Sequence, residues 1–166
     1  MVEFKELSIK DGRQVFEMLQ DIKKEENGFH NEANGLSFTE FKDYLEKNKK
    51  MSDGIDLPDG YVPQTIYWLW VDDKPVGMGK LRHYLNDFLR EKGGHAAYAV
   101  RESERKKGYG KLILKEIIKK AKEKDIKEIL LTVDDDNTAS RKVIEANGGR
   151  LEKTKNGECY YWIENI

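Results

Sequence analysis

Residues 97–111 have the sequence AYAVRESERKKGYGK. The apolar residues at its start predict the end of a β-strand that covers His95–Val100. From Gly108 onward, apolar residues recur at helical spacing and predict an α-helix over 108–124. A strand therefore runs through a short turn directly into a helix, and the rest of the fold is predicted around this junction.

The start of this helix has the features of an anion-binding site. The backbone N–H groups in the first turn of a helix have no internal partner, and the helix dipole places partial positive charge there. Gly108 and Gly110 carry no side chains that would hold a ligand away from these amides. Four basic side chains surround them: Arg105, Lys106, Lys107 and Lys111. Because cations oppose the dipole at a helix N-terminus, this pattern favours a bound pyrophosphate over an ordinary helix start with incidental glycines.

The motif Arg105-x-x-Gly108-x-Gly110 resembles the acetyl-CoA signature Gln/Arg-x-x-Gly-x-Gly/Ala of the GNAT N-acetyltransferase superfamily. Residues 131–140 (LTVDDDNTAS), followed by Asn147-Gly148-Gly149, are similar to the next strand and helix of that family. The resemblance covers roughly residues 65–163. It implies a GNAT-like α/β fold, with a central mixed, mostly antiparallel sheet, a parallel splayed strand pair and flanking helices, in a single domain over residues 1–166.

The remaining elements are predicted from periodicity and turn residues. Strands are expected at 2–9, 65–71, 76–82, 128–133, 150–155 and 159–163, and helices at 11–26, 37–48 and 137–147, with a short helix or ordered loop at 84–92. Ser37 and Glu40 form a capping box for the second helix, and Asn156-Gly157 predicts a hairpin turn. Gly28 is expected to end the first helix. Both faces of strand 65–71 are apolar, which predicts that both are covered.

Composition narrows the class of protein. A hydrophobic content of 38% and an aromatic content of 10% are typical of a folded globular protein. The 30 basic residues nearly cancel the 31 acidic ones, and a net charge of −1 argues against a nucleic-acid binder, which needs surplus cations to neutralise phosphates. Residues 1–60 carry 14 acidic and 9 basic side chains, whereas residues 101–166 carry 13 and 16. The basic C-terminal part favours an anionic ligand there.

The sequence gives no support for a disulfide, a metal site, a membrane span or a signal peptide. Cys159 is the only cysteine, which excludes an intrachain disulfide, and no residue cluster has metal-ligand spacing. The longest apolar run, Ile66 to Val71, is too short to cross a bilayer, and the N-terminus lacks the apolar stretch of a signal peptide. A soluble cytoplasmic protein without a membrane partner is expected.

The resemblance assigns residues to acetyl-CoA. In the family, the pantetheine arm inserts between the splayed strands and bonds to the backbone of the first. Tyr98, Ala99 and Val100 would then pair with pantetheine amides, and Asn137 and Ser140 would approach the same arm from the second helix. For these last two, plain capping and packing is the alternative. The pyrophosphate would be cradled by the loop and helix start: Arg105, Lys106, Lys107, Gly108, Tyr109, Gly110 and Lys111.

Acetyl transfer also needs groups that move protons. An alkylamine is protonated at pH 7 at a cost of about 4 kcal/mol, which a general base offsets. The candidates for base or acid are His95, His83, Tyr160, Tyr161 and Glu102, with a structural role as the alternative for each histidine. The N–H of Val100 is a candidate donor to the thioester oxygen. Many relatives carry a Tyr acid seven residues after the helix-opening Asn, whereas this chain has Ile144.

The predicted function is transfer of the acetyl group from acetyl-CoA to a primary amine of a small molecule or peptide by direct attack. The net charge of −5 in residues 1–60 favours a cationic acceptor. The alternative is a GNAT-like module that binds CoA as a sensor without turnover. A Rossmann nucleotide binder is disfavoured, because its motif needs a further glycine where residues 105–107 are Arg-Lys-Lys. Aromatic strand ends are compatible with a homodimer but define no interface.

Overall fold

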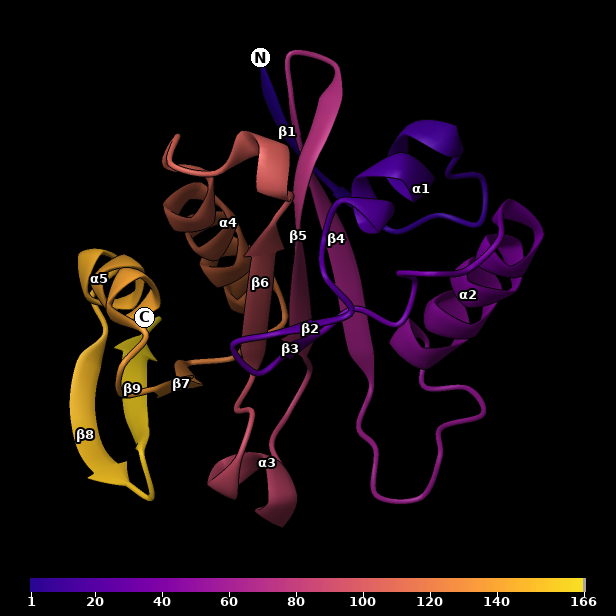
Figure 1. Cartoon of the computed structure of the whole chain (residues 1–166). Coiled ribbons are helices and arrows are strands. Elements are labelled where there is room, and N and C mark those ends of the chain that lie inside the picture. Colours follow the sequence, from indigo (N-terminus) through magenta and orange to yellow (C-terminus); the bar gives the residue numbers. More distant parts are fainter. Residues whose placement is uncertain (166) are drawn as a thin grey trace.

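The computed structural model describes residues 1–165 (Figure 1). In chain order its elements are β1 (Val2–Glu6), α1 (Arg13–Gln20), β2 (Glu25–Glu26), β3 (Phe29–His30), α2 (Phe38–Ser52), β4 (Gln64–Val71), β5 (Lys74–Arg82), α3 (Asp87–Glu91), β6 (Ala96–Val100), a 3₁₀ turn (Glu102–Glu104), α4 (Tyr109–Glu123), β7 (Glu128–Asp134), α5 (Thr138–Ala146), β8 (Arg150–Lys155) and β9 (Glu158–Glu164). The predicted strand–turn–helix junction is β6, the 3₁₀ turn and α4.

The strands form two main sheets. One has the order β1-β4-β5-β6 and the other the order β7-β9-β8, and every strand pair described is antiparallel. The predicted α/β fold class is confirmed. The predicted central mixed sheet is divided into two antiparallel sheets, and β6 and β7, the strands predicted to splay apart, form no hydrogen-bonded ladder with each other. They meet at one point, where the His95 N–H donates to the Leu130 carbonyl over 2.8 Å, and this break between the sheets creates the cleft described below.

Helices cover both faces of the four-stranded sheet. Trp68 of β4 is fully buried in a cluster with α1 and α2, while Tyr67 and Leu69 on the opposite face pack in a cluster with α4. Figure 1 shows α1 and α2 on one side of β4 and β5 and α4 on the other. Strand 65–71 is therefore covered on both faces, as its apolar alternation predicts.

Helix α4 approaches the sheet closely over β5. A Cβ atom at Gly77 would lie 2.6 Å from Ile113 Cδ1, and one at Gly79 would lie 2.8 Å from Ile117 Cδ1. These two glycines let the apolar face of α4 rest directly on the β5 backbone. The position of α4, and with it the amide-rich start of the helix, is fixed by this contact.

The N-terminal helices show one success and one error of the sequence prediction. The capping box at α2 is confirmed, since the Glu40 N–H donates to Ser37 Oγ and the Ser37 N–H donates to a Glu40 carboxylate oxygen. The first helix, predicted to reach Glu26, ends at Gln20. The Asn31 side chain donates to the carbonyl of Leu19 in the last turn of the helix and to the carbonyl of Ile22 just beyond it.

Residues 25–30 form a hairpin instead of the end of that helix. Asn27 and Gly28 adopt φ values of 50° and 81° between β2 and β3. Positive φ at both central residues is typical of the tight turns that join antiparallel strands, and Asn-Gly is a favoured sequence for them. Gly28 therefore belongs to a hairpin turn and does not end a helix. This β2–β3 hairpin lies across β6 and β5 in the view of Figure 1.

Candidate functional site

A cleft of about 590 Å³ opens where β6 and β7 separate. Its walls are β6, the loop and first turn of α4, the second half of β7 and the start of α5, and the β2–β3 hairpin contributes from the N-terminal part of the chain. Eleven of the twelve residues that the sequence assigns to acetyl-CoA line it: Tyr98, Ala99, Val100, Arg105, Lys106, Gly108, Tyr109, Gly110, Lys111, Asn137 and Ser140. The exception is Lys107.

The register of β6 determines which of its backbone groups face the cleft. The Arg82 N–H donates to the His95 carbonyl, and the Arg101 N–H donates to the Val76 carbonyl. In an antiparallel ladder the bonded positions alternate, so Ala97 and Ala99 direct their backbone groups toward β5. The N–H and C=O groups of Tyr98 and Val100 point the other way. Of the three residues predicted to bond pantetheine, Tyr98 and Val100 therefore offer backbone groups to the cleft.

The same reasoning applies to the opposite wall. The Asp135 N–H donates to the Gly157 carbonyl at the end of the β7–β9 ladder, so odd-numbered residues of β7 face β9. The backbone groups of Thr132 and the N–H of Asp134 consequently point toward β6, while the Asp134 carbonyl accepts from the Asn137 N–H over 3.0 Å. The two walls of the cleft thus present backbone donors and acceptors to each other across a gap that a linear amide-containing ligand can fill.

The start of α4 presents a concave row of backbone amides. Lys106 has φ 66° and Gly108 has φ 82°, both in the left-handed region, and no side chain caps the helix. Within residues 1–165 the N–H groups of 106–111 donate no hydrogen bond. A Cβ at Gly108 would meet nothing within 4 Å. Unpaired amides in such a turn at a helix N-terminus bind phosphate oxygens, so the residues present fit a pyrophosphate.

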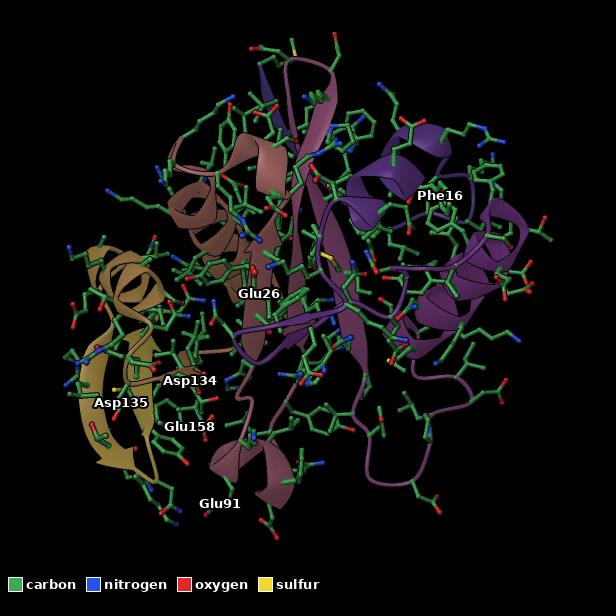
Figure 2. The ribbon with its side chains drawn as sticks, in the orientation of Figure 1. Phe16, Glu26, Glu91, Asp134, Asp135 and Glu158 are labelled. Carbon is green, nitrogen blue, oxygen red and sulfur yellow. The ribbon has the colours of Figure 1, made fainter. Side chains whose placement is uncertain are left out.

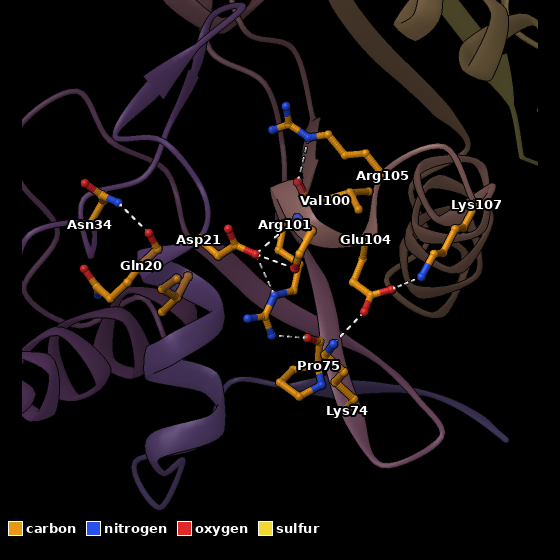
Figure 3. A network of polar contacts seen from close by, with 12 residues as sticks. Gln20, Asp21, Asn34, Lys74, Pro75, Val100, Arg101, Glu104, Arg105 and Lys107 are labelled. Carbon is orange, nitrogen blue, oxygen red and sulfur yellow. Dashed lines mark hydrogen bonds and ion pairs between the residues drawn. The ribbon is translucent and has the colours of Figure 1, made fainter.

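Two of the basic side chains at this end are already engaged (Figure 3). Lys107 donates to Glu104 over 2.7 Å, and Lys74 donates to the other oxygen of the same carboxylate over 2.6 Å. The two ammonium groups lower the pKa of Glu104 to about 2. Lys107 is therefore held by Glu104, and it does not line the cleft. Lys106 and Lys111 make no side-chain hydrogen bond or ion pair with residues 1–165.

Arg105 joins the loop to the hairpin. Its Nη2 lies 2.7 Å from a carboxylate oxygen of Glu26 on β2, and its Nε donates to the Val100 carbonyl over 3.2 Å. Figure 3 shows a second link nearby, in which the Asp21 carboxylate accepts a hydrogen bond from Arg101. The same carboxylate also accepts from the Ser103 hydroxyl. The segment that follows α1 is thus held against the phosphate-loop side of the cleft at two points.

The start of α5 contacts β6 across the cleft. Asn137 Oδ1 accepts a hydrogen bond from the Ser140 N–H over 3.3 Å, which is the capping role considered as an alternative. Ser140 Oγ lies 2.8 Å from the Tyr98 hydroxyl, so the two walls are joined here. Burial raises the pKa of Tyr98, whose hydroxyl therefore stays protonated near neutral pH. One turn further along α5, Ile144 is buried and places no hydroxyl in the cleft.

His95 lies outside the cleft and connects the two sheets. Its Nδ1 accepts a hydrogen bond from the Leu130 N–H over 2.9 Å, while its own N–H donates to the Leu130 carbonyl. Burial, with Arg90 and Arg82 nearby, lowers its pKa to about 4. The ring is therefore neutral at pH 7 and holds β6 against β7 at the point where the cleft closes.

The other predicted proton-transfer residues do not line the cleft either. His83 Nε2 lies 2.7 Å from Thr65 Oγ1, and burial lowers the pKa of this histidine. The Tyr160 hydroxyl donates to the Glu91 carbonyl. Tyr161 binds Arg141 and Glu145. Glu102, just past β6, is exposed in the 3₁₀ turn.

Several cleft residues were missed by the sequence analysis. The hairpin contributes Glu26 and Phe29, β7 contributes Asp134, and the start of β9 contributes Glu158. Figure 2 labels the three carboxylates among them, which come from distant parts of the sequence. The Asn27-Gly28 turn was the available signal for the hairpin. Nothing in the sequence indicated that its carboxylate would face the acetyl-CoA motif.

The sequence pattern described as "Acetyltransferase (GNAT) family" matches residues 17–148. This match covers most of the chain and includes the loop and both walls of the cleft. The chain belongs to the GNAT acetyltransferase family. No curated protein sequence matches it significantly.

Solved GNAT structures share the fold at low sequence identity. The Campylobacter jejuni N-acetyltransferase PseH in complex with acetyl coenzyme A is 15% identical, with a TM-score of 0.64 and coverage of 100% of both chains. The PaiA N-acetyltransferase of Thermoplasma acidophilum, in complex with coenzyme A, is 18% identical, with a TM-score of 0.62 and 99% coverage of both. A Salmonella typhimurium acetyltransferase that modifies the N-terminal serine of ribosomal protein L7/L12 is 16% identical, with a TM-score of 0.64 and coverage of 98% and 94%. At these identities the likeness establishes the fold.

Two further features concern the described residues alone. No helix in residues 1–165 is long and apolar enough to span a membrane. Within the same residues, no group of three His, Cys, Asp or Glu side chains is arranged to hold a metal ion.

Proposed function

We propose that this GNAT protein transfers the acetyl group of acetyl-CoA to a primary amine of a small molecule or peptide. The observation that carries the proposal is the cleft between β6 and β7, which ends at the unpaired amides of residues 106–111. Its volume of about 590 Å³ is in the range of small-molecule sites. PseH and PaiA, which share this fold, were crystallised with acetyl-CoA and CoA respectively.

The residues present define how the co-substrate would be held. The amides of residues 106–111, with Lys106 and Lys111, would bind the pyrophosphate, and the backbone groups of Tyr98 and Val100 would pair with pantetheine amides. The Val100 N–H would also be available to the thioester oxygen as negative charge develops on it. When bound, acetyl-CoA supplies an activated acyl group as a thioester.

The transfer itself is a direct attack. The neutral amine nitrogen forms a bond to the acetyl carbonyl carbon, the carbon–sulfur bond breaks, and sulfur leaves as a thiolate that takes a proton from solvent. The amine must lose a proton, and the carboxylates of Asp134 and Glu158 line the cleft and can accept it through water. His95, His83, Tyr160 and Glu102 remain predictions as catalytic residues, and the geometry of the cleft gives them no support.

The acidic lining also bears on the acceptor. Glu26 lies at the basic end of the cleft, paired with Arg105, whereas Asp134 and Glu158 come from two other elements and line the same cleft. A cationic amine would be attracted to these last two carboxylates before it loses its proton. This supports a cationic acceptor, in agreement with the acidic N-terminal third of the sequence.

The first test is calorimetric titration of the protein with acetyl-CoA. In the variant Gly110→Glu, a carboxylate at the second helical position of α4 would repel the pyrophosphate, yet it would favour the helix itself because acidic residues stabilise helix N-termini. The matched control is Thr39→Glu, which introduces the same side chain at the second helical position of α2 on an exposed site. We expect binding to wild type and Thr39→Glu and its loss in Gly110→Glu. Absence of binding to the wild-type protein would refute the proposal.

The second candidate function is a CoA-binding module without turnover, and Ile144 favours it, because no hydroxyl is placed at that position to protonate the leaving thiolate. Release of free thiol from acetyl-CoA, measured with a panel of amines, separates the two functions. Acceptor-dependent thiol release that Gly110→Glu abolishes supports the enzyme. Tight binding with no release above the uncatalysed rate for any amine supports the module.

A further inference from the structure

A second cavity, of about 340 Å³, lies apart from the acetyl-CoA cleft. It is formed by the segment after β5, the connection between α4 and β7 with the first residue of β7, His95 just before β6, and single residues of α3 and β9. It shares no lining residue with the cleft. Its volume is in the range of sites for small ligands.

A buried hydrogen-bond donor opens into this cavity. His95 is 6% exposed, and its Nδ1 accepts the Leu130 N–H, so the proton of the neutral ring resides on Nε2. Nε2 has no hydrogen-bond partner within residues 1–165, and it is not among their fully enclosed unpaired atoms, so it reaches open space. The open space that His95 lines is this cavity. A buried N–H group without a partner is costly unless water or a ligand accepts from it.

The charges around the cavity favour an anion. Arg90, Lys124 and Lys127 line it, and none of their side chains forms an ion pair within residues 1–165. Two carboxylates, Asp125 and Glu128, also line it, which leaves one positive charge in excess. Arg90 contributes to the lowered pKa of His95, and Lys124 contributes to that of His83. Burial is the larger cause of both pKa shifts, and a bound anion would offset the charge of these cations.

We propose that this cavity binds a small oxyanion, with the His95 Nε2–H as its buried hydrogen-bond donor and Arg90, Lys124 and Lys127 as its counter-charges. The oxyanion group is a phosphate or a carboxylate of a small molecule. The ligand would contact the imidazole that, through its other nitrogen, holds β6 to β7 at the closed end of the acetyl-CoA cleft. The proposal does not depend on acetyl transfer.

The test uses inorganic phosphate and succinate as probes, in the Gly110→Glu background so that neither binds at the α4 amides. Side-chain ¹H–¹⁵N spectra follow the three histidines. We expect one of the two probes to shift the His95 Nε2 resonance in a saturable manner and to leave that of exposed His30 unchanged. The probe that binds more tightly identifies phosphate or carboxylate as the ligand class.

Two charge-reversal variants test whether the probe binds in this cavity. Lys124→Glu should weaken binding at least tenfold, whereas Lys122→Glu should leave it unchanged, because Lys122 lies two residues earlier in the last turn of α4, is exposed and does not line the cavity. The proposal is overturned if neither probe shifts His95 at millimolar concentrations, or if Lys124→Glu and Lys122→Glu weaken binding equally.

Discussion

Arg105 Nη2 and Glu26 Oε1 lie 2.7 Å apart and join the acetyl-CoA motif to a hairpin almost eighty residues earlier in the chain. The motif arginine is thus bound to a carboxylate at the site where a pyrophosphate would bring competing negative charge. Lys23 adds a second cation beside Glu26, at 3.3 Å. Co-substrate binding and the position of the hairpin are therefore expected to be linked.

Glu26→Gln tests this link. Without the ion pair, Arg105 would be free to meet the pyrophosphate, and because a partly exposed ion pair contributes about 0.2–1 kcal/mol, acetyl-CoA should bind up to about fivefold more tightly. Calorimetric titration measures the change. Glu25→Gln, at the exposed neighbour, is the control and should have no effect. Weaker binding in Glu26→Gln would show that Arg105 does not exchange partners.

The Tyr98–Ser140 hydrogen bond predicts a coupled loss of stability. Tyr98→Phe and Ser140→Ala should each lower the free energy of unfolding by about 0.5–1.5 kcal/mol. Because both changes remove the same bond, the double variant should lose clearly less than the sum of the two single losses. Urea unfolding of all four proteins completes the cycle. Additive losses would mean that the bond between the two walls contributes nothing.

Protonation of His95 predicts that stability falls in mild acid. In the unfolded chain this imidazole takes up a proton below pH 6.5, whereas the folded protein resists it until about pH 4. The unfolded state then binds more protons, so the free energy of unfolding should drop by about 2 kcal/mol from pH 7 to pH 5. His83, whose pKa is also lowered, acts in the same direction.

The pH effect is assigned by substitution. In His95→Gln, urea unfolding should show a much smaller loss between pH 7 and pH 5, even though the variant starts from a lower stability. His30→Gln, at an exposed ring, should retain the wild-type slope. An unchanged slope in His95→Gln would attribute the acid sensitivity to other groups.

Gly94→Ala should be strongly destabilising. Gly94 has φ 60°, and an added Cβ would collide with the Leu130 carbonyl oxygen, which accepts the His95 N–H. Backbone strain and steric overlap together should cost at least about 2 kcal/mol. Gly12→Ala is a matched control, because Gly12 has φ −113° and open space around its Cβ position. Thermal unfolding distinguishes the two, and equal melting temperatures would contradict the prediction.

The sequence was informative where a local pattern has a single physical interpretation. The Ser37–Glu40 capping box and the Asn156-Gly157 turn both lie where they were predicted. The glycines of the acetyl-CoA motif also led to the cleft, because a positive φ and uncovered amides are local properties of the backbone. The predicted C-terminal end of α1 was wrong. Asn31, whose side chain binds the Leu19 carbonyl in the last turn, lies eleven residues beyond the end of the helix.

The roles of individual side chains were harder to predict from the sequence than the helices and strands. His95 and His83 were proton-transfer candidates on residue type alone, and the fold places both at the second cavity. Lys107 lies between cleft-lining neighbours, yet its side chain pairs with Glu104 and does not line the cleft. These outcomes depend on contacts between segments distant in sequence. No periodicity or spacing in one chain encodes them directly.

The break between β6 and β7 has a consequence for solubility. Tyr98 and Val100 leave strand-edge groups without backbone partners within residues 1–165, and such edges are templates on which strands of other chains can add. The β2–β3 hairpin and the Tyr98–Ser140 bond narrow access to this edge. A ligand that lies along β6 would cover it as a further strand does. Occupancy of the cleft should therefore protect the protein from self-association as well as equip it for chemistry.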